Sequence, residues 1–229
     1  MKKLKWFLYK SLFNNNVGKF ILNAKFKTRY RSAADYWEKR YQKEGTSGTG
    51  SYGTLAMYKA GVLNKFVVEN NVTTVIEFGC GDGNQLQQFE FPSYIGLDVS
   101  LTAIEKCIDI FKNDSTKSFF IYDHRGFVDN LKTFKAGLAL SLDVLYHLLE
   151  DDVFEVYMKH LFSSSTRFVI IYAWDIDGQK SQHVKYRKFT VWIEKNIQDF
   201  HLIQTIENKD PQPACDFFIY EMQKFTPEG

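Results

Sequence analysis

A glycine-rich stretch from Val75 to Leu86 constrains this sequence more than any other part of it. Residues 73–78 are mostly β-branched and aromatic and predict a short buried strand, which runs directly into glycines at alternate positions, Gly79, Gly81 and Gly83. Glycine tolerates positive φ and lets a ligand approach the backbone, and the residues that follow are expected to open a helix whose N–H groups face that ligand. A strand that ends in such a loop predicts a small-molecule binding site, although a tight turn with packing glycines is the simpler alternative.

The side chains around the glycines reduce the number of ligand classes that this loop could bind. A phosphate-binding loop would carry Lys and Ser/Thr after its last glycine, and a dinucleotide-binding loop would have its third glycine where Asn84 stands. Glu77, two residues before Gly79, would repel a pyrophosphate but attract a ligand with an ammonium and a sulfonium group. The pattern acidic-x-Gly-x-Gly-x-Gly resembles motif I of the class I S-adenosylmethionine (SAM)-dependent methyltransferases. The resemblance implies SAM as cofactor, S-adenosylhomocysteine (SAH) as product, and a Rossmann-like α/β fold with a seven-stranded, mostly parallel sheet, an antiparallel last strand and added N-terminal helices.

Composition and charge limit the substrate and the compartment. At 229 residues with 45% hydrophobic residues, the chain suits one α/β domain with additions, predicted as a basic helical extension with a glycine-rich lid (1–54) and a methyltransferase domain (55–229). Residues 1–34 hold nine Lys/Arg and no Asp/Glu, so the rest is mildly acidic, which argues against a nucleic-acid substrate. Three widely spaced cysteines predict no metal site and a cytoplasmic location, with Cys80 as a packing residue.

The basic leader, residues 1–31, interleaves lysines with Trp, Phe and Leu. No apolar run approaches a signal-peptide core or a membrane span in length. Two interpretations stay open. The leader is an interfacial helix that makes peripheral contact with an anionic membrane, or it packs on its own domain or on the second subunit of a homodimer.

The remaining pattern alternates helices and strands, as in a parallel sheet. A helix is expected at 32–41, followed by a mobile lid over the cofactor at 45–53, with a flexible linker as the alternative. Tyr52 in the lid is placed to reach the methionine carboxylate. Further helices are predicted at 55–70, 101–111, 150–162 and 185–197, and a polar loop at 175–183. Strands are predicted at 94–98, 117–122, 136–142, 167–174, 201–207 and 215–223, the last two forming a hairpin.

Acidic residues at strand ends are candidates for holding the adenosine. Asp98 ends the second strand, where its carboxylate could accept both ribose hydroxyls, and Asp123 ends the third, where it is either an adenine ligand or a turn carboxylate before Gly126. The resemblance, carried over by position, implies these cofactor residues: Glu77, Gly79 and Gly81 for the methionine and sugar, Asp98 for the ribose, Val99, Asp123 and the backbone of His124 for the adenine, and Leu142 along the site.

The acceptor site is expected after the fourth strand, at Asp143, Tyr146 and His147. An alcohol acceptor needs a general base, and His147 is the candidate; the alternative is a helix-start residue bonded to backbone. Asp143 either orients His147 or caps the next helix. An acceptor that is already anionic needs cations instead. His183 and Arg187, together with Tyr52, are therefore candidate substrate ligands, although a solvated basic helix is an equal alternative.

Three further segments look like bacterial methyltransferases found among surface-polysaccharide and capsule genes: Tyr36-Trp37-Glu38-x-x-Tyr41, Ser51-Tyr52-Gly53 and Leu142-Asp143-Val144-Leu145-Tyr146-His147. This resemblance implies O-methylation of a polar, anionic sugar precursor or small molecule, with a phosphate or phosphoramidate among the acceptors. Two alternatives remain, a lipid-linked acceptor at the membrane and a cofactor-binding regulatory subunit without turnover.

Overall fold

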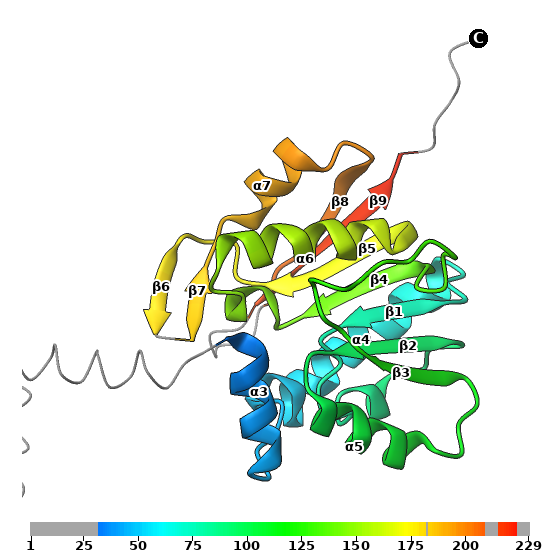
Figure 1. The fold of residues 1–229 in the computed structure, drawn as a ribbon. Helices are drawn as coiled ribbons and strands as arrows, with labels where there is room; N and C mark the ends of the chain where they lie inside the picture. The colour runs from blue at the N-terminus through cyan, green and yellow to red at the C-terminus, as the bar shows by residue number, and fades with distance from the viewer. Residues whose placement is uncertain (1–31, 182, 209–214, 224–229) are drawn as a thin grey trace, which may run out of the picture.

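The computed structural model describes residues 32–181, 183–208 and 215–223 (Figure 1). The predictions for the basic leader, residues 1–31, lie outside the described residues, as do residues 209–214 between the two strands of the predicted terminal hairpin. Elements are labelled as in Figure 1.

Seven strands form one sheet in the order β3-β2-β1-β4-β5-β9-β8. The first five run parallel to one another, and β9 is antiparallel to both of its neighbours, β5 and β8. The predicted Rossmann-like sheet and its terminal hairpin are confirmed. The strands are β1 (Val75–Phe78), β2 (Tyr94–Asp98), β3 (Lys117–Ile121), β4 (Ala136–Leu142), β5 (Ser165–Ala173), β8 (Phe200–Ile206) and β9 (Asp216–Met222).

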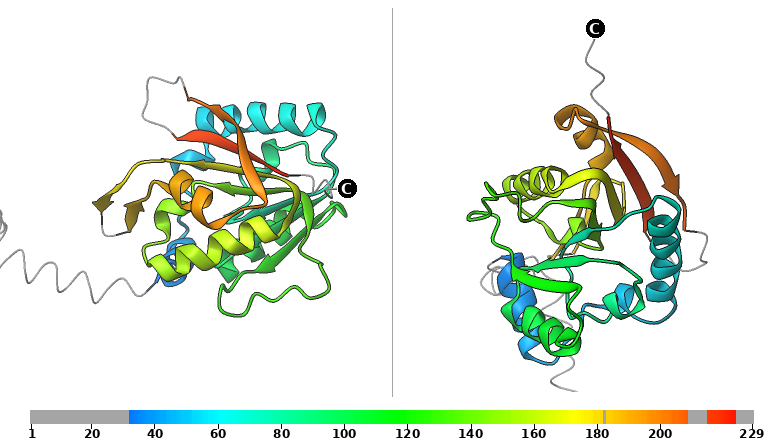
Figure 2. Two further views of the ribbon diagram at one scale, coloured as in Figure 1. Left: turned by 90° about the horizontal axis from the view of Figure 1, so that it is seen from above. Right: turned by 90° about the vertical axis from the view of Figure 1, so that its right-hand side faces the viewer.

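Helices cover both faces of this sheet (Figure 2). α4 (Gly53–Glu69) and α5 (Leu101–Phe111) pack on the face that carries Leu138, Leu140 and Leu142. α6 (Asp151–Ser163) and α7 (Phe189–Asn196) pack on the other face. Successive strand residues point to opposite faces, so a strand such as β4 must be apolar throughout to fill both layers. α3 (Ala33–Gln42), with Ser32 as its N-cap, lies outside the two layers beside α5.

The predicted alternation of strands and helices fails at two crossovers within the described residues. The segment after the glycines forms only a short 3₁₀ helix (Leu86–Gln88), and the connection between β3 and β4 contains no α-helix. Few residues separate Gly83 from β2, and among them Leu86, Phe89 and Phe91 are buried in the core. An extended path that buries these three side chains takes the place of the expected helix.

The predicted polar loop at 175–183 and helix at 185–197 are wrong in part. β6 (Gly178–Ser181) and β7 (Val184–Tyr186) pair as a small antiparallel hairpin, and α7 begins only at Phe189. Asp175 fixes this start, because its carboxylate accepts hydrogen bonds from the amide and hydroxyl of Thr190 at 3.0 and 2.6 Å. Arg187 therefore precedes the helix and does not share a helical face with His183.

Candidate functional site

The glycine loop after β1 takes a conformation that other residues would strain. Gly79, Gly81 and Gly83 have φ of 89°, 63° and 80°. A Cβ on Gly79 would lie 2.4 Å from Val144 Cγ2, and one on Gly81 would lie 2.3 Å from Ser47 Oγ. The Gly81 amide donates to Asp98 Oδ2 at 3.0 Å, which joins the loop to the end of β2. The glycines thus let this loop pack closely against Ser47, earlier in the chain, and against Val144, later in the chain.

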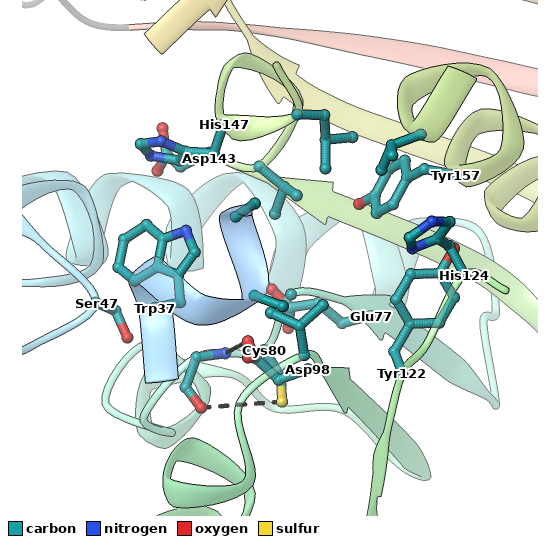
Figure 3. Close-up of a pocket in the computed structure, with 18 of the residues that line it drawn as sticks. Trp37, Ser47, Glu77, Cys80, Asp98, Tyr122, His124, Asp143, His147 and Tyr157 are labelled. Atoms are coloured by element: carbon teal, nitrogen blue, oxygen red, sulfur yellow. Dashed lines mark hydrogen bonds between the residues drawn. The ribbon is translucent and has the colours of Figure 1, made fainter. Parts of the chain in front are cut away.

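A cavity of about 500 Å³ opens at the carboxyl ends of β1, β2 and β4. Figure 3 shows Glu77 and Asp98 on one wall, Asp143 and His147 on the opposite wall, and Trp37 and His124 at the two ends. Of the predicted cofactor residues, all but Tyr52 line the cavity: Glu77, Gly79, Gly81, Asp98, Val99, Asp123, His124 and Leu142.

The two carboxyls on the inner wall are buried, with Glu77 4% and Asp98 7% exposed. Burial raises the pKa of Glu77 to about 7, although the Tyr94 hydroxyl donates to its Oε2 at 2.6 Å and Lys59 is nearby. Burial likewise raises the pKa of Asp98 to about 6, against the opposing effect of amide donors from Gly81 and Ser100. Carboxyls held at this cost are well suited to a ligand that brings its own cation or hydroxyl groups.

Asp123 lies at the exposed rim and is held by Arg125. Nε and NH2 of Arg125 donate to the two carboxylate oxygens at 3.0 and 2.7 Å, and this pairing lowers the pKa of Asp123 to about 2. Asp123 also accepts from the Arg125 amide, as in a turn. Asp123 is thus a turn carboxylate that also lines the cavity, and its role as an adenine ligand stays a prediction.

The predicted lid, residues 45–53, lies against the glycine loop. Ser47 and Asp82 form a reciprocal pair: the Ser47 amide donates to Asp82 Oδ2 at 3.0 Å, and the Asp82 amide donates to Ser47 Oγ at 2.9 Å. The Tyr52 hydroxyl also donates to Asp82 Oδ2, at 2.8 Å. Ser47 and Ser51 line the cavity, so the lid forms part of its wall. Tyr52 is directed to Asp82, and its role as a ligand for the methionine carboxylate stays a prediction.

The acceptor candidates form two hydrogen-bonded groups. Asp143, with φ of 61°, accepts from the Tyr146 hydroxyl at 2.9 Å and from Lys59 Nζ at 2.7 Å. His147 is bonded elsewhere, since its Nδ1 lies 3.1 Å from the backbone oxygen of His183. A carbonyl can only accept, so Nδ1 carries the proton and Nε2 is the basic nitrogen of the neutral ring. Asp143 thus contacts Tyr146 and Lys59, and it is the His183 carbonyl that orients His147.

His147 is neutral at physiological pH. Burial lowers its pKa to about 4, in spite of the His183 carbonyl, and the Trp37 ring meets it edge-on with the centroids 5.0 Å apart. The hydroxyl of Tyr146 also stays protonated, because burial and the Asp143 carboxylate raise its pKa well above the ordinary value. Of these residues, His147 is the one equipped to accept a proton.

The two predicted substrate ligands, His183 and Arg187, make separate contacts. The His183 ring stacks on Tyr36 with centroids 5.2 Å apart. The Arg187 guanidinium donates to Asp151 at 2.7 Å and to the Leu149 carbonyl at 2.8 Å, and it covers the Phe154 ring. These contacts hold β7 to the start of α6. Neither residue lines the cavity, and their role in substrate binding stays a prediction.

No family model and no curated protein matches this sequence. Solved structures do. The chain is similar to magnesium protoporphyrin IX methyltransferase (ChlM) from Synechocystis PCC 6803 with bound SAM, at a TM-score of 0.61 and 14% identity over 84% of this chain and 98% of that one. It is also similar to the N-methyltransferase NodS from Bradyrhizobium japonicum WM9 in complex with SAH, at a TM-score of 0.60 and 15% identity over 73% of this chain and 86% of that one. The methyltransferase domain of bacterial CtHen1 is similar to this chain at a TM-score of 0.55 and 20% identity, over 73% of this chain and 98% of that one. The chain has the fold of SAM-dependent methyltransferases.

The residues at the carboxyl edge of this methyltransferase fold fit SAM. Gly79 and Gly81 of the glycine loop line the cavity, Glu77 is a buried anion beside it, and Oε1 of the buried Gln85 has no hydrogen-bond partner among the described residues. Asp98 at the end of β2 presents a carboxylate for hydroxyl groups. Within the described ranges, no group of His, Cys, Asp and Glu could hold a metal ion, and no helix is long and apolar enough to cross a membrane.

The sequence analysis missed Lys59, which lines the cavity, and a contact outside the cavity that Glu38 makes. Lys59 lines the cavity although it is 0% exposed, and Glu38 joins α3 to the start of α5 by accepting from the hydroxyls of Ser100 and Thr102 at 2.6 and 2.7 Å. A signal for Lys59 was present, since it stands on the apolar face of its helix between Ala56 and Leu63. A lone lysine at such a position requires a buried partner. The position of Glu38 gives no comparable signal, because its partners come 62 and 64 residues later.

Proposed function

We propose that this protein is a SAM-dependent methyltransferase that methylates an oxygen of a small, polar acceptor. The observation that carries the proposal is the cavity itself, which has Glu77 and Asp98 on one wall and the neutral His147 on the opposite wall (Figure 3). One wall suits an adenosyl amino acid and the other suits a proton-accepting step.

When bound, SAM supplies a methyl group made electrophilic by its sulfonium. Glu77 holds the ammonium of the cofactor, Asp98 accepts from the ribose hydroxyls, and the glycine loop allows close approach. His147 accepts the proton of an acceptor hydroxyl at Nε2, while its Nδ1–H remains bonded to the His183 carbonyl. His147 is half-buried, and its ring meets the Trp37 ring edge-on.

The finer assignment rests on the motif resemblance. It names an anionic sugar precursor or small molecule used in surface-glycan or capsule modification, with a phosphate or phosphoramidate among the acceptors and His183 and Arg187 as ligands. Because Arg187 already pairs with Asp151, such an acceptor has to share or replace that partner. A cytoplasmic location, peripheral membrane contact through residues 1–31 and a homodimer belong to the same proposal.

Titration calorimetry tests the cofactor half of this proposal. SAH should bind the folded chain, and no binding of SAM or SAH at millimolar concentration would overturn it. The acceptor half is tested by a screen of sugar nucleotides, phosphorylated amino acids and their amides, with SAM present and release of homocysteine from the SAH product as the readout. Turnover confined to uncharged acceptors would contradict the anionic assignment.

A further inference from the structure

Lys59 is a buried lysine that lines the cavity. Its residue exposure is 0%, its Nζ lies 2.7 Å from Asp143 Oδ2, and it faces the Tyr172 ring at 5.3 Å. The bond to Asp143 is the hydrogen bond that Lys59 makes within the described residues. A lysine ammonium has three donors, and burial makes each unused donor costly. Lys59 therefore retains donor capacity at a wall of the cavity.

Gln85 supplies a complementary orphan acceptor. It is 5% exposed, and its Nε2 donates to the Ala56 carbonyl at 3.0 Å, three residues before Lys59 on α4. Its Oε1 is buried without a hydrogen-bond partner in the described part of the chain. Buried amide oxygens are rarely left unpaired in native proteins. Since Gln85 lines the same cavity, the missing donor is expected to come from a ligand.

Glu77 completes the group. It also lines the cavity, and the positive charge of Lys59 acts on it to favour the ionised form. The lining of the cavity thus includes an anion, an ammonium and an unpaired acceptor, each buried. A zwitterion with one ammonium and one carboxylate matches this set, whereas a plain nucleoside would leave Lys59 and Gln85 as they are.

We propose that Lys59, Gln85 and Glu77 form a site for the amino-acid end of the cofactor, in which Lys59 Nζ binds the α-carboxylate while Gln85 Oε1 and Glu77 bind the α-ammonium. The inference rests on the proposed function. It gives Lys59 the role in carboxylate binding that the sequence suggested for Tyr52, whose hydroxyl is already bonded to Asp82.

The test compares ligands that differ only at the amino-acid end. Calorimetry measures the affinity of the full-length protein for SAH, for its decarboxylated analogue and for its deaminated analogue. The wild type should bind SAH about 30-fold more tightly than the decarboxylated analogue, as expected for one charge-assisted hydrogen bond. In Lys59→Met this ratio should fall to about one. The matched control is Lys65→Met, at a 72%-exposed lysine of the same helix, and it should keep the wild-type ratio.

Gln85→Met tests the other half of the site. It should weaken SAH by about 10-fold and leave the deaminated analogue nearly unchanged, because only the former offers an ammonium to Oε1. Equal losses for both analogues would assign Gln85 a purely structural role and overturn its place in the site.

Other outcomes separate the two proposals. A wild type that binds SAH and its decarboxylated analogue equally overturns the amino-acid site and leaves the proposed function intact. A folded wild type that binds neither overturns the proposed function. Lys59→Met leaves Asp143 without its cation, so the double variant Lys59→Met/Asp143→Asn provides a folded form if the single variant does not fold. If the double variant keeps the wild-type ratio of affinities for SAH and its decarboxylated analogue, the role of Lys59 is also refuted.

Discussion

Replacing Glu77 by Gln should raise the unfolding free energy of the cofactor-free protein and lower its affinity for the cofactor. Glu77 is 4% exposed and its principal hydrogen bond comes from the Tyr94 hydroxyl, which an amide oxygen also accepts. Gln keeps the size of the side chain and removes its charge. The variant therefore isolates the cost of holding a carboxylate in the buried wall of the cavity.

The magnitude follows from the pKa of Glu77. Burial raises this pKa from 4.5 to about 7, and at 1.36 kcal/mol for each tenfold change the difference corresponds to about 3 kcal/mol. Between pH 4.5 and 7 the folded state holds this proton while the unfolded state has released it, so the unfolding free energy falls as pH rises through that window. Above about pH 8 the full loss of about 3 kcal/mol is present. In Glu77→Gln this pH dependence is absent.

The assay is urea unfolding of the cofactor-free protein at a series of pH values from 5 to 8.5. Wild-type stability should fall across the series by up to about 3 kcal/mol more than that of Glu77→Gln. SAH affinity should move in the opposite sense. It rises with pH in the wild type as Glu77 ionises, and at pH 8 the variant binds about 10- to 100-fold more weakly because it has lost the charge opposite the ligand ammonium.

Glu105→Gln, on the exposed side of α5, is the matched control and should leave both measurements unchanged. If Glu77→Gln loses stability with rising pH as steeply as the wild type does, the raised pKa of Glu77 is refuted. If its SAH affinity equals that of the wild type, Glu77 does not face the cofactor ammonium.

Three further predictions concern the opposite wall, the lid and β7. His147→Ala should abolish turnover while SAH affinity stays within about twofold; in the wild type at saturating cofactor, kcat should show no histidine limb between pH 8 and 5, because the pKa of His147 is lowered to about 4, and a limb near 6.5 would contradict this. Gly81→Ala should weaken SAH at least 10-fold and expose residues 45–53 to limited proteolysis, because its Cβ would lie 2.3 Å from Ser47 Oγ at φ of 63°. Arg187→Met should lower the unfolding free energy by about 2 kcal/mol, because the hydrogen bonds to Asp151 and to the Leu149 carbonyl are lost. Unchanged stability together with a raised KM for the acceptor would instead favour a role of Arg187 in substrate binding.

Local signals account for the parts of the fold that the sequence predicted. The bounds of β2, β4 and α5 agree with the predicted ranges because each is set by its own residues: apolar runs for the strands, and for the helix the side chain of Ser100, which accepts from the Ala103 amide. The positions of Glu77 and Asp98 follow from the same strand ends. Carboxyl ends of neighbouring parallel strands meet at one edge of the sheet, so these two residues could be placed together without any tertiary information.

Tertiary partners decide the remainder. Lys59 meets Asp143 from 84 residues away, and Ser47 meets Asp82 from 35 residues away, so no local pattern identifies either pair. The start of α7 depends on Asp175, which lies in a different part of the chain from the helix residues it holds. His183 and Arg187 were spaced as helical neighbours, and the β6–β7 hairpin separates them because backbone pairing there replaces the helix.

The junction of α3 with α5 bears on the order in which the protein is made. Glu38 rests on Ser100 and Thr102, so α3 leaves the ribosome well before the surface that receives it exists. Until then Tyr41, which is 3% exposed in the folded protein, keeps its neighbours Trp37 and Ser47 but lacks Lys106 of α5, which covers its ring. Contacts between distant residues also form slowly. The glycine loop is synthesised early, but Asp143 and His147 of the opposite cavity wall follow β4, so a nascent chain gains the complete cavity only after β4 has been made.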